Sequence, residues 1–220
     1  MSHKESGFSL IEIAMSLMVV GVLIGATLKG RDIILSARLH KTLSQITQIQ
    51  LGKSVFQERY GALPGDFGRA TQLWGADTFD GNQDGHVSGL GRAPQQESTG
   101  FWNHLALSGL ISGGKTSDPL FSHSLPTTPV GGEFTVEEDP DGLSGLWLIL
   151  GKANGDRNTS PLLTPAQASF LDGNLDDGAP HRGRVQAREG HGIQAGQCVR
   201  DGTYRLDVTD PTCILYVALE

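Results

Sequence analysis

The sequence lacks several short motifs that mark enzyme active sites. It contains no C-x-x-C, H-E-x-x-H or G-x-S-x-G pattern, the local signatures of disulfide oxidoreductases, zinc peptidases and many serine hydrolases. No nucleophile is paired with a base in a recognisable spacing. We therefore expect a protein that is not an enzyme and has no catalytic residues.

Positive charge is also scarce. The chain has 17 Lys and Arg against 24 Asp and Glu, a net charge of −7, so as a whole it lacks the basic footprint of a nucleic-acid-binding protein. One local set of basic residues could face DNA or an acidic neighbour, but it is more typical of a solvated loop. Its members are His181, Arg182, Arg184, Arg188 and His191.

Cysteine occurs only twice, at Cys198 and Cys213. In a cytosolic protein these residues would be two thiols, whereas in an exported protein they would form one disulfide. Closing a loop of this length stabilises a fold by about 3 kcal/mol on the chain-entropy model. The choice depends on the compartment, and hence on the N-terminus.

Proline is absent before Pro64, so nothing interrupts a long helix at the start of the chain. Residues 8–28 carry one charge, Glu12, and a run of this length is enough to cross the hydrocarbon core of a membrane. No Ala-x-Ala-like cleavage site follows it, so it predicts a membrane span and not an ordinary signal peptide. Gly21 and Gly25 form a G-x-x-x-G pair, which fits either close helix packing or the general frequency of Gly in membrane helices.

The residues at the start of this run resemble a known processing signal. Lys4 to Gly7, followed by Phe8-Ser9-Leu10-Ile11-Glu12, is similar to the leader and cleavage site shared by type IV pilins and type II secretion pseudopilins. The resemblance implies that a prepilin peptidase cuts between Gly7 and Phe8 and methylates the new amine of Phe8. It also implies other pilin or pseudopilin subunits, an inner-membrane assembly platform and an ATPase as partners.

Glu12 is the unusual residue of the span, because a carboxylate there is costly unless it has a partner. After cleavage the amine of Phe8 would be cationic and four residues away from Glu12. The Phe8 amine of a neighbouring subunit would serve equally well and would set the axial register of an assembly. The alternative is a glutamate that is tolerated near the membrane interface.

The charges that flank the span disagree with the leader. Only Lys4 precedes it, whereas Lys29, Arg31, Arg38 and Lys41 follow it, and the positive-inside rule would place the large C-terminal part in the cytoplasm. The leader and the two cysteines favour the opposite orientation. We therefore expect a single-pass protein of the bacterial inner membrane with a periplasmic C-terminal domain.

Beyond the span, the sequence predicts an α+β fold of pilin-like design. We expect three segments: a leader at 1–7, a long N-terminal helix over residues 8–60 that ends at Gly61, and a globular domain at 61–220. The helix would pack on a small antiparallel sheet with long loops in the globular domain. Its apolar stripe consists of Leu35, Leu39, Leu43, Ile46, Ile49 and Phe56. Further helices are expected at 101–111 and from Thr164, and strands at 133–138, 145–151, 182–187, from Cys198, and at 213–219.

Two acidic loops are candidate calcium sites. Asp80, Asn82 and Asp84 alternate as in D-x-[DN]-x-[DN]-G, a pattern that can wrap Ca²⁺. Gly91 stands where an EF-hand needs Glu, so any site would need oxygens from elsewhere, and the alternative is a cluster of Asx turns. The resemblance adds that some pseudopilins are stabilised by calcium. The segment 172–178 repeats the alternation after a helix.

These observations favour a structural subunit, a minor pilin or pseudopilin of a type IV pilus or a type II secretion fibre. The residues do not distinguish the two machines. A membrane-anchored periplasmic binding module, with or without calcium, is an alternative of another class. A DNA-uptake minor pilin is a third possibility and would need a basic surface strip.

Overall fold

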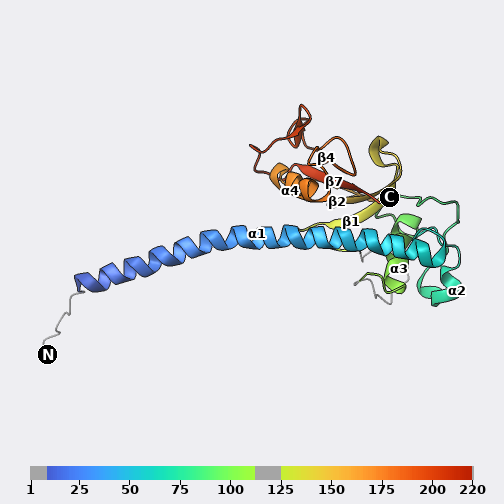
Figure 1. Ribbon diagram of the computed structural model, residues 1–220, viewed down its shortest axis with the longest axis horizontal. Helices are drawn as coiled ribbons and strands as arrows, with labels where there is room; N and C mark the ends of the chain where they lie inside the picture. Colours follow the sequence, from blue (N-terminus) through green and yellow to red (C-terminus); the bar gives the residue numbers. More distant parts are fainter. Residues whose placement is uncertain (1–8, 112–124, 220) are drawn as a thin grey trace.

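The computed structural model describes residues 9–111 and 125–219. One helix, α1 (Leu10–Tyr60), runs through 51 residues and is about 75 Å long at 1.5 Å per residue. It ends where expected, because Gly61 adopts the left-handed conformation (φ 71°) and donates its N–H to the Gln57 carbonyl oxygen at 2.9 Å. Figure 1 shows the first half of α1 projecting away from all other elements.

The sheet that covers the second half of α1 is antiparallel. Its strand order is β1 (Glu133–Glu138), β2 (Leu146–Asn154), β7 (Cys213–Ala218) and β4 (Val185–Glu189), with β3 (Arg157–Ser160) pairing the end of β2. β7 and residues 146–150 of β2 are apolar because both faces of the sheet are covered there. Leu148, Leu215 and Val217 belong to the main core, whereas Ile149 and Tyr216 belong to a smaller cluster on the other face.

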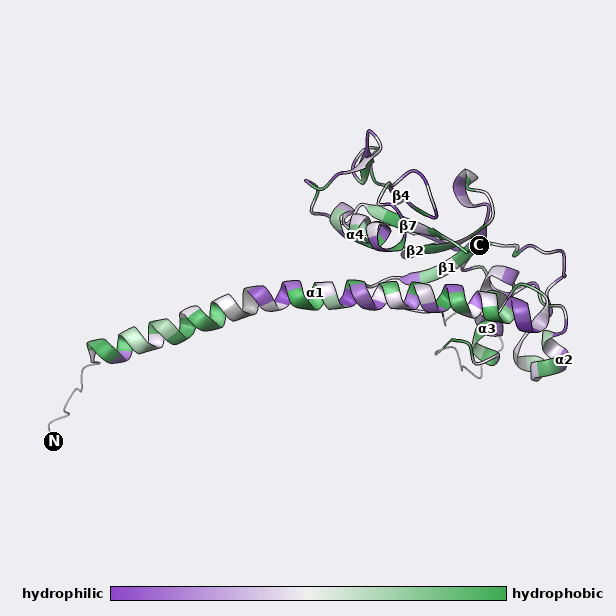
Figure 2. Cartoon of the chain, viewed as in Figure 1, coloured by the Kyte–Doolittle hydropathy of each residue, from purple (hydrophilic) through white to green (hydrophobic). Residues whose placement is uncertain are grey.

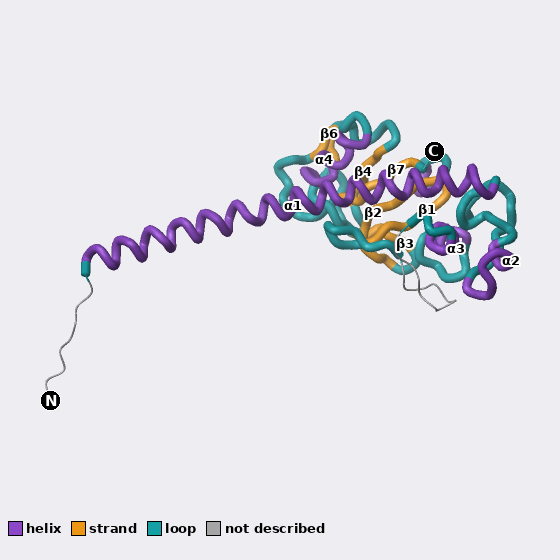
Figure 3. Tube along the Cα trace, turned by 60° about the horizontal axis from the view of Figure 1, so that its bottom comes forward, coloured by secondary structure: helices purple, strands orange, loops and turns teal. Residues whose placement is uncertain are grey.

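The remaining elements surround this framework. They are α2 (Ala70–Trp74), the 3-10 turns η1 (Gly75–Asp77) and η2 (Pro140–Gly142), α3 (Glu97–Leu107), α4 (Pro165–Leu175), and the hairpin of β5 (Val199–Arg200) with β6 (Thr203–Tyr204). The α4 start is as expected: Thr164 accepts from the Gln167 N–H at 3.2 Å, and Pro165 occupies the first turn. Figures 1 and 3 place α4 beside α1, and α2 with α3 at the far end of the helix.

The α+β prediction is confirmed, with corrections to its details. Of the stripe on α1, Leu39, Ile46, Ile49 and Phe56 are buried and Leu43 is half-buried, but Leu35 is 39% exposed because the sheet does not reach that far along the helix. The helix expected at 101–111 begins at Glu97 and ends at Leu107, since Gly109 turns left-handed. The Gly113-Gly114 pair, expected to end it, lies outside the described residues.

Two strand predictions also need correction, and one strand was missed. The strand expected at 182–187 runs from Val185 to Glu189. The strand expected from Cys198 is instead a short hairpin, in which each of the two strands has two residues. The polar strand β3 was not predicted, because Arg157-Asn158-Thr159-Ser160 shows no apolar alternation. The Cys198–Cys213 disulfide is confirmed, with 5.2 Å between the two Cα atoms.

An aromatic cluster ties the end of α1 to the loops after it. Phe56 is fully buried, stacks on His104 of α3 at 6.0 Å between ring centroids, and contacts Tyr60, Phe67 and Trp74. His104 Nδ1 accepts the Gly65 N–H at 2.9 Å, so the ring proton lies on Nε2, 3.1 Å from the Phe79 carbonyl oxygen. Burial lowers the pKa of His104 to about 4.

Phe56→Ala should lower the free energy of unfolding by about 3–5 kcal/mol, because it removes a ring from the centre of this cluster. Leu51→Ala on the same helix is the matched control, since Leu51 is 63% exposed and its loss should cost less than about 0.5 kcal/mol. Denaturant unfolding of the full chain in micelles measures both. Equal losses would contradict the packing described here.

Acid should destabilise the fold through His104. Its folded pKa of about 4 lies below the ordinary 6.5, so the unfolded chain takes up the proton first. The free energy of unfolding should therefore fall by about 3 kcal/mol between pH 6.5 and 4. His104→Gln should flatten this slope, whereas the carboxylates titrate in both proteins. Parallel pH profiles of the two proteins would rule out a buried neutral imidazole.

Candidate assembly helix and acidic loop cluster

The first half of α1 is apolar on every side and is not covered by any described residue. Between Leu10 and Ile24 the large apolar side chains are all at least half exposed, from Val20 at 50% to Leu10 at 87%. Figure 2 shows this segment as a nearly continuous apolar stretch. It is long and apolar enough to cross a membrane, and no part of it is buried in the structure. Such a surface is unfavourable in water and suits lipid or neighbouring helices.

Glu12 is the single charged residue in this surface. It is exposed and lies in the first turn of α1. In this turn the Glu12 N–H donates to the Ser9 carbonyl oxygen at 3.0 Å. The positive end of the helix dipole favours a carboxylate at this position. Gly7 and Phe8, the predicted processing residues, lie outside the described residues, so their pairing with Glu12 stays a prediction.

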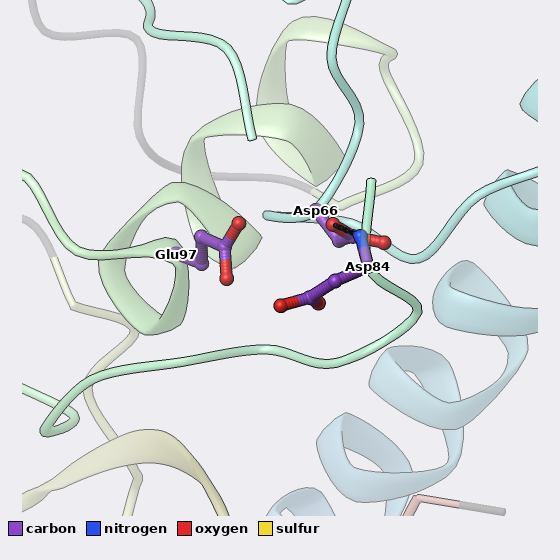
Figure 4. Close-up of side chains that lie close together, drawn as sticks. All are labelled: Asp66, Asp84 and Glu97. Atoms are coloured by element: carbon purple, nitrogen blue, oxygen red, sulfur yellow. Dashed lines mark hydrogen bonds between the residues drawn. The ribbon is translucent and has the colours of Figure 1, made fainter. Parts of the chain in front are cut away.

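Three carboxylates converge in the loops beyond the end of α1. Figure 4 shows Asp66, Asp84 and Glu97 pointing toward one another, and we call them the acidic cluster. One oxygen from each lies within 4.8 Å of the others. Asp66 and Glu97 are buried, whereas Asp84 is exposed. The cluster could therefore offer carboxylate oxygens to a Ca²⁺ ion.

These carboxylates also organise the loop around them. Asp66 accepts backbone N–H groups of Asp84 at 3.1 Å and Gly85 at 3.0 Å, and Glu97 accepts those of Asn82 and Ser88, each at 2.9 Å. Burial, reinforced by the charge of Glu97, raises the pKa of Asp66, although the N–H donors partly oppose the shift. On the outside, the hydrogen bond to Glu138 raises the pKa of His86.

The structure brings together only part of the predicted calcium set. Asp84 belongs to the acidic cluster, and Asn82 lies next to it with its Nδ2 2.9 Å from Asp84 Oδ2. Asp80 is engaged elsewhere, because its oxygens accept the N–H and hydroxyl of Thr71, both at 2.8 Å, which lowers its pKa. Asp66 and Glu97 were missed because neither belongs to the alternating motif. The calcium site itself stays a prediction.

The second acidic loop is also assembled by the fold. Asp172, Asp176 and Asp177 lie together at the end of α4. Their oxygens already have donors: the Tyr204 hydroxyl at 2.7 Å from Asp172, the backbone of Arg184 and Val185 on Asp176, and Arg182 Nε at 2.9 Å from Asp177. Burial raises the pKa of Asp172.

The basic residues near the C-terminus have local partners. Arg182 pairs with Asp177, as above, and Arg184 donates to the Leu175 carbonyl oxygen at 3.3 Å. Arg188 donates to the Asp141 carbonyl oxygen at 2.6 Å, and its guanidinium lies 5.5 Å from the centre of the Tyr216 ring. Each of these three arginines therefore has a partner within the chain, while Arg182 and Arg184 stay exposed.

One further sequence match was missed. Residues 109–116 fit G-x-x-x-x-G-K-[ST], the pattern of a phosphate-binding loop. Such a loop follows a strand, whereas residue 109 follows α3, and residues 112–116 lie outside the described part. On its N-terminal side, which the structure describes, the match is therefore preceded by a helix and not by the strand that a phosphate-binding loop requires.

The described residues thus define a chain with an apolar stalk and an α+β globular part. No model of a known protein family matches the chain, and no curated protein matches it. Among solved structures it is similar to the major type IV pilin PilA1 from Clostridium difficile, with 13% identity, a TM-score of 0.39, and coverage of 83% of this chain and 94% of that chain. The long apolar N-terminal helix and the antiparallel sheet packed on it fit a pilin-like protein.

Calcium should raise the melting temperature of the full chain in micelles by about 5 °C at saturation, if the acidic cluster binds it. Asp84→Asn should abolish the shift, because Asp84 is the exposed member of the cluster. Asp80→Asn is the matched control and should keep it, since Asp80 faces Thr71. An unchanged melting temperature, or the same loss in both variants, would rule out this site.

Proposed function

We propose that this chain is a structural subunit, a minor pilin or pseudopilin, of a type IV pilus or a type II secretion fibre. A prepilin peptidase removes residues 1–7 and methylates the amine of Phe8. The mature chain waits in the bacterial inner membrane with its globular part in the periplasm. An assembly platform and its ATPase then move it into a fibre, which lies in the periplasm or at the cell surface.

One observation carries the proposal: an apolar stalk that nothing in the described chain covers, with a single carboxylate in its first turn. In the membrane, lipid covers the stalk. In a fibre, the stalks of neighbouring subunits cover it, and Glu12 meets a Phe8 amine. Because this pair lies in an apolar medium, it is strong when formed and costly when one partner is missing.

Both machines would use the same helix chemistry. The genes beside this one would distinguish a pilus, with its own platform and peptidase genes, from a secretion operon. No catalytic step is part of the proposal, since the work of such a subunit is assembly.

A membrane-anchored binding module is the second candidate, and one observation favours it. A cleft of about 670 Å³ at the end of α1 is lined by Tyr60, Phe67 and Arg69, and it shares Asp66 with the acidic cluster. Clefts of this size with a few converging polar groups bind small ligands. A ligand that binds in the cleft only with Ca²⁺ would support this candidate.

Glu12→Gln should reduce fibre assembly in the native host by at least about tenfold, because the Phe8 amine loses its charged partner in an apolar medium. The measurement is the amount of this subunit in sheared or overexpressed fibres, with membrane levels as the reference. Ser16→Ala, one turn further along the same exposed surface, is the control and should assemble normally. Normal assembly of Glu12→Gln would contradict the proposed role of the carboxylate.

A further inference from the structure

An open groove lies where α1 leaves the globular part. It has a volume of about 610 Å³ and joins three segments that are far apart in the sequence. Leu35 and Leu39 come from α1, Phe170 from α4, and Leu206 and Val208 from the loop after β6. The groove is mainly apolar, although Asp32 lies at its edge.

The outer rim of the groove is strongly exposed. Leu206 is 64% exposed, the highest value among the described large apolar side chains beyond α1, where Leu73 has 54% and Leu90 has 44%. On α1 the rim is formed by Leu35, which is 39% exposed. Single exposed leucines are common, but Leu206 and Leu35 border the same mainly apolar groove, and exposed apolar side chains that lie together mark an interaction surface.

The loop that carries Leu206 is held in place. The Cys198–Cys213 disulfide closes its base, and the Arg205 guanidinium donates to Asp207 at 2.7 Å and to the Gly196 carbonyl oxygen at 2.9 Å. The Leu206 N–H donates to the Tyr204 carbonyl oxygen at 3.0 Å and closes a tight backbone turn. The exposure of Leu206 is therefore built into the fold.

This rim faces the stalk side of the molecule. Figures 1 and 3 show the β6 region and α4 at the end of the globular part nearest the projecting half of α1. From Lys29, the first charge after the apolar run, to Leu35 the helix rises about 9 Å. The headgroup layer is about 5–8 Å thick on each side, and membrane helices tilt by about 20°. A tilt toward the sheet brings the rim to the lipid surface.

The charges nearest the rim suit phosphate headgroups. Lys29 and Arg31 are exposed at the exit of the stalk, and Arg38 and Lys41 follow on α1. Three acidic side chains oppose them: Asp32, Asp207, which is already paired with Arg205, and Asp210. Each Lys or Arg near an anionic lipid surface strengthens binding by about fivefold.

Resting on the anchoring proposed above, we infer that the globular part docks on the outer surface of the same bilayer. The rim of Leu35, Leu206 and Val208 sits in the headgroup layer of anionic phospholipid, while Lys29 and Arg31 bind its phosphates. This assigns a role to the positive charges that follow the span, which the positive-inside rule leaves unexplained. Extraction into a fibre would have to release this contact.

Hydrogen exchange on the full chain tests the inference. The chain is placed at one copy per nanodisc, with phosphatidylglycerol in one sample and only phosphatidylcholine in the other, and micelles serve as the reference. The amides of residues 205–208 should exchange about tenfold more slowly in the anionic discs than in micelles, as expected for one to two cation contacts. Lys29→Gln with Arg31→Gln should remove the advantage of the anionic lipid.

Leu206→Ser with Val208→Ser should remove the protection. Leu73→Ser should keep it, because Leu73 is an exposed leucine of α2, the helix that Figure 1 shows at the far end of the globular part. Equal exchange in discs and micelles would overturn the inference, as would protection that survives the double serine variant. Protection that appears only with two chains per disc would assign the rim to a second copy instead. A chain that does not stay with the discs would refute the anchoring itself.

Discussion

The burial of one side of α1 against the sheet is the contact on which the rest of the fold depends. Ile46, Ile49 and Phe56 are nearly or fully buried, and they meet the sheet, α3 and the loops at the end of the helix. The same helix continues without a break into a segment that none of the residues in 9–111 and 125–219 covers. A helix without proline or a cap between the two halves transmits any movement of the stalk to the globular part. This continuity is what a subunit pulled out of a membrane by its stalk requires.

Buried and half-buried carboxylates hold the loops between the short strands. Glu97, Asp66 and Asp176 each accept two or more donors, mostly backbone N–H groups, and Glu189 accepts three backbone N–H groups around the disulfide, from Gly196, Cys198 and Val199. A carboxylate can satisfy several such donors at once, which suits glycine-rich turns. The acidic cluster is thus part of the loop architecture. The raised pKa of Asp66 indicates a site where a cation would relieve the cost of burial.

Much of the framework could be predicted because its signals are local. The 3.6-residue stripe on α1, the glycine after Tyr60, the Thr164 cap and the strand at Glu133–Glu138 are all read within a few residues. The disulfide was predicted from two cysteines in a domain that was expected to be exported. The misses concern distant contacts: Leu35 is exposed because the sheet ends before it, and β3 forms because it pairs β2 and not because of its own residues.

The candidate site was predicted in the same uneven way. Glu12 stands out in the sequence because a charge interrupts an apolar run. The acidic cluster does not, since Asp66, Asp84 and Glu97 come from three separate segments that only the folded chain brings within 4.8 Å. The groove beside the stalk is a further example, because Leu206 has no neighbour in sequence that links it to Leu35.

The central claim is that residues 8–28 are a processed assembly stalk, and the N-terminus of the protein in its own host tests it most directly. Mass spectrometry of the chain extracted from host membranes should find a mature N-terminus at Phe8 that carries one methyl group. A chain that still begins at Met1, or one that is cut at another position, would contradict the account and leave an anchored domain without an assembly role.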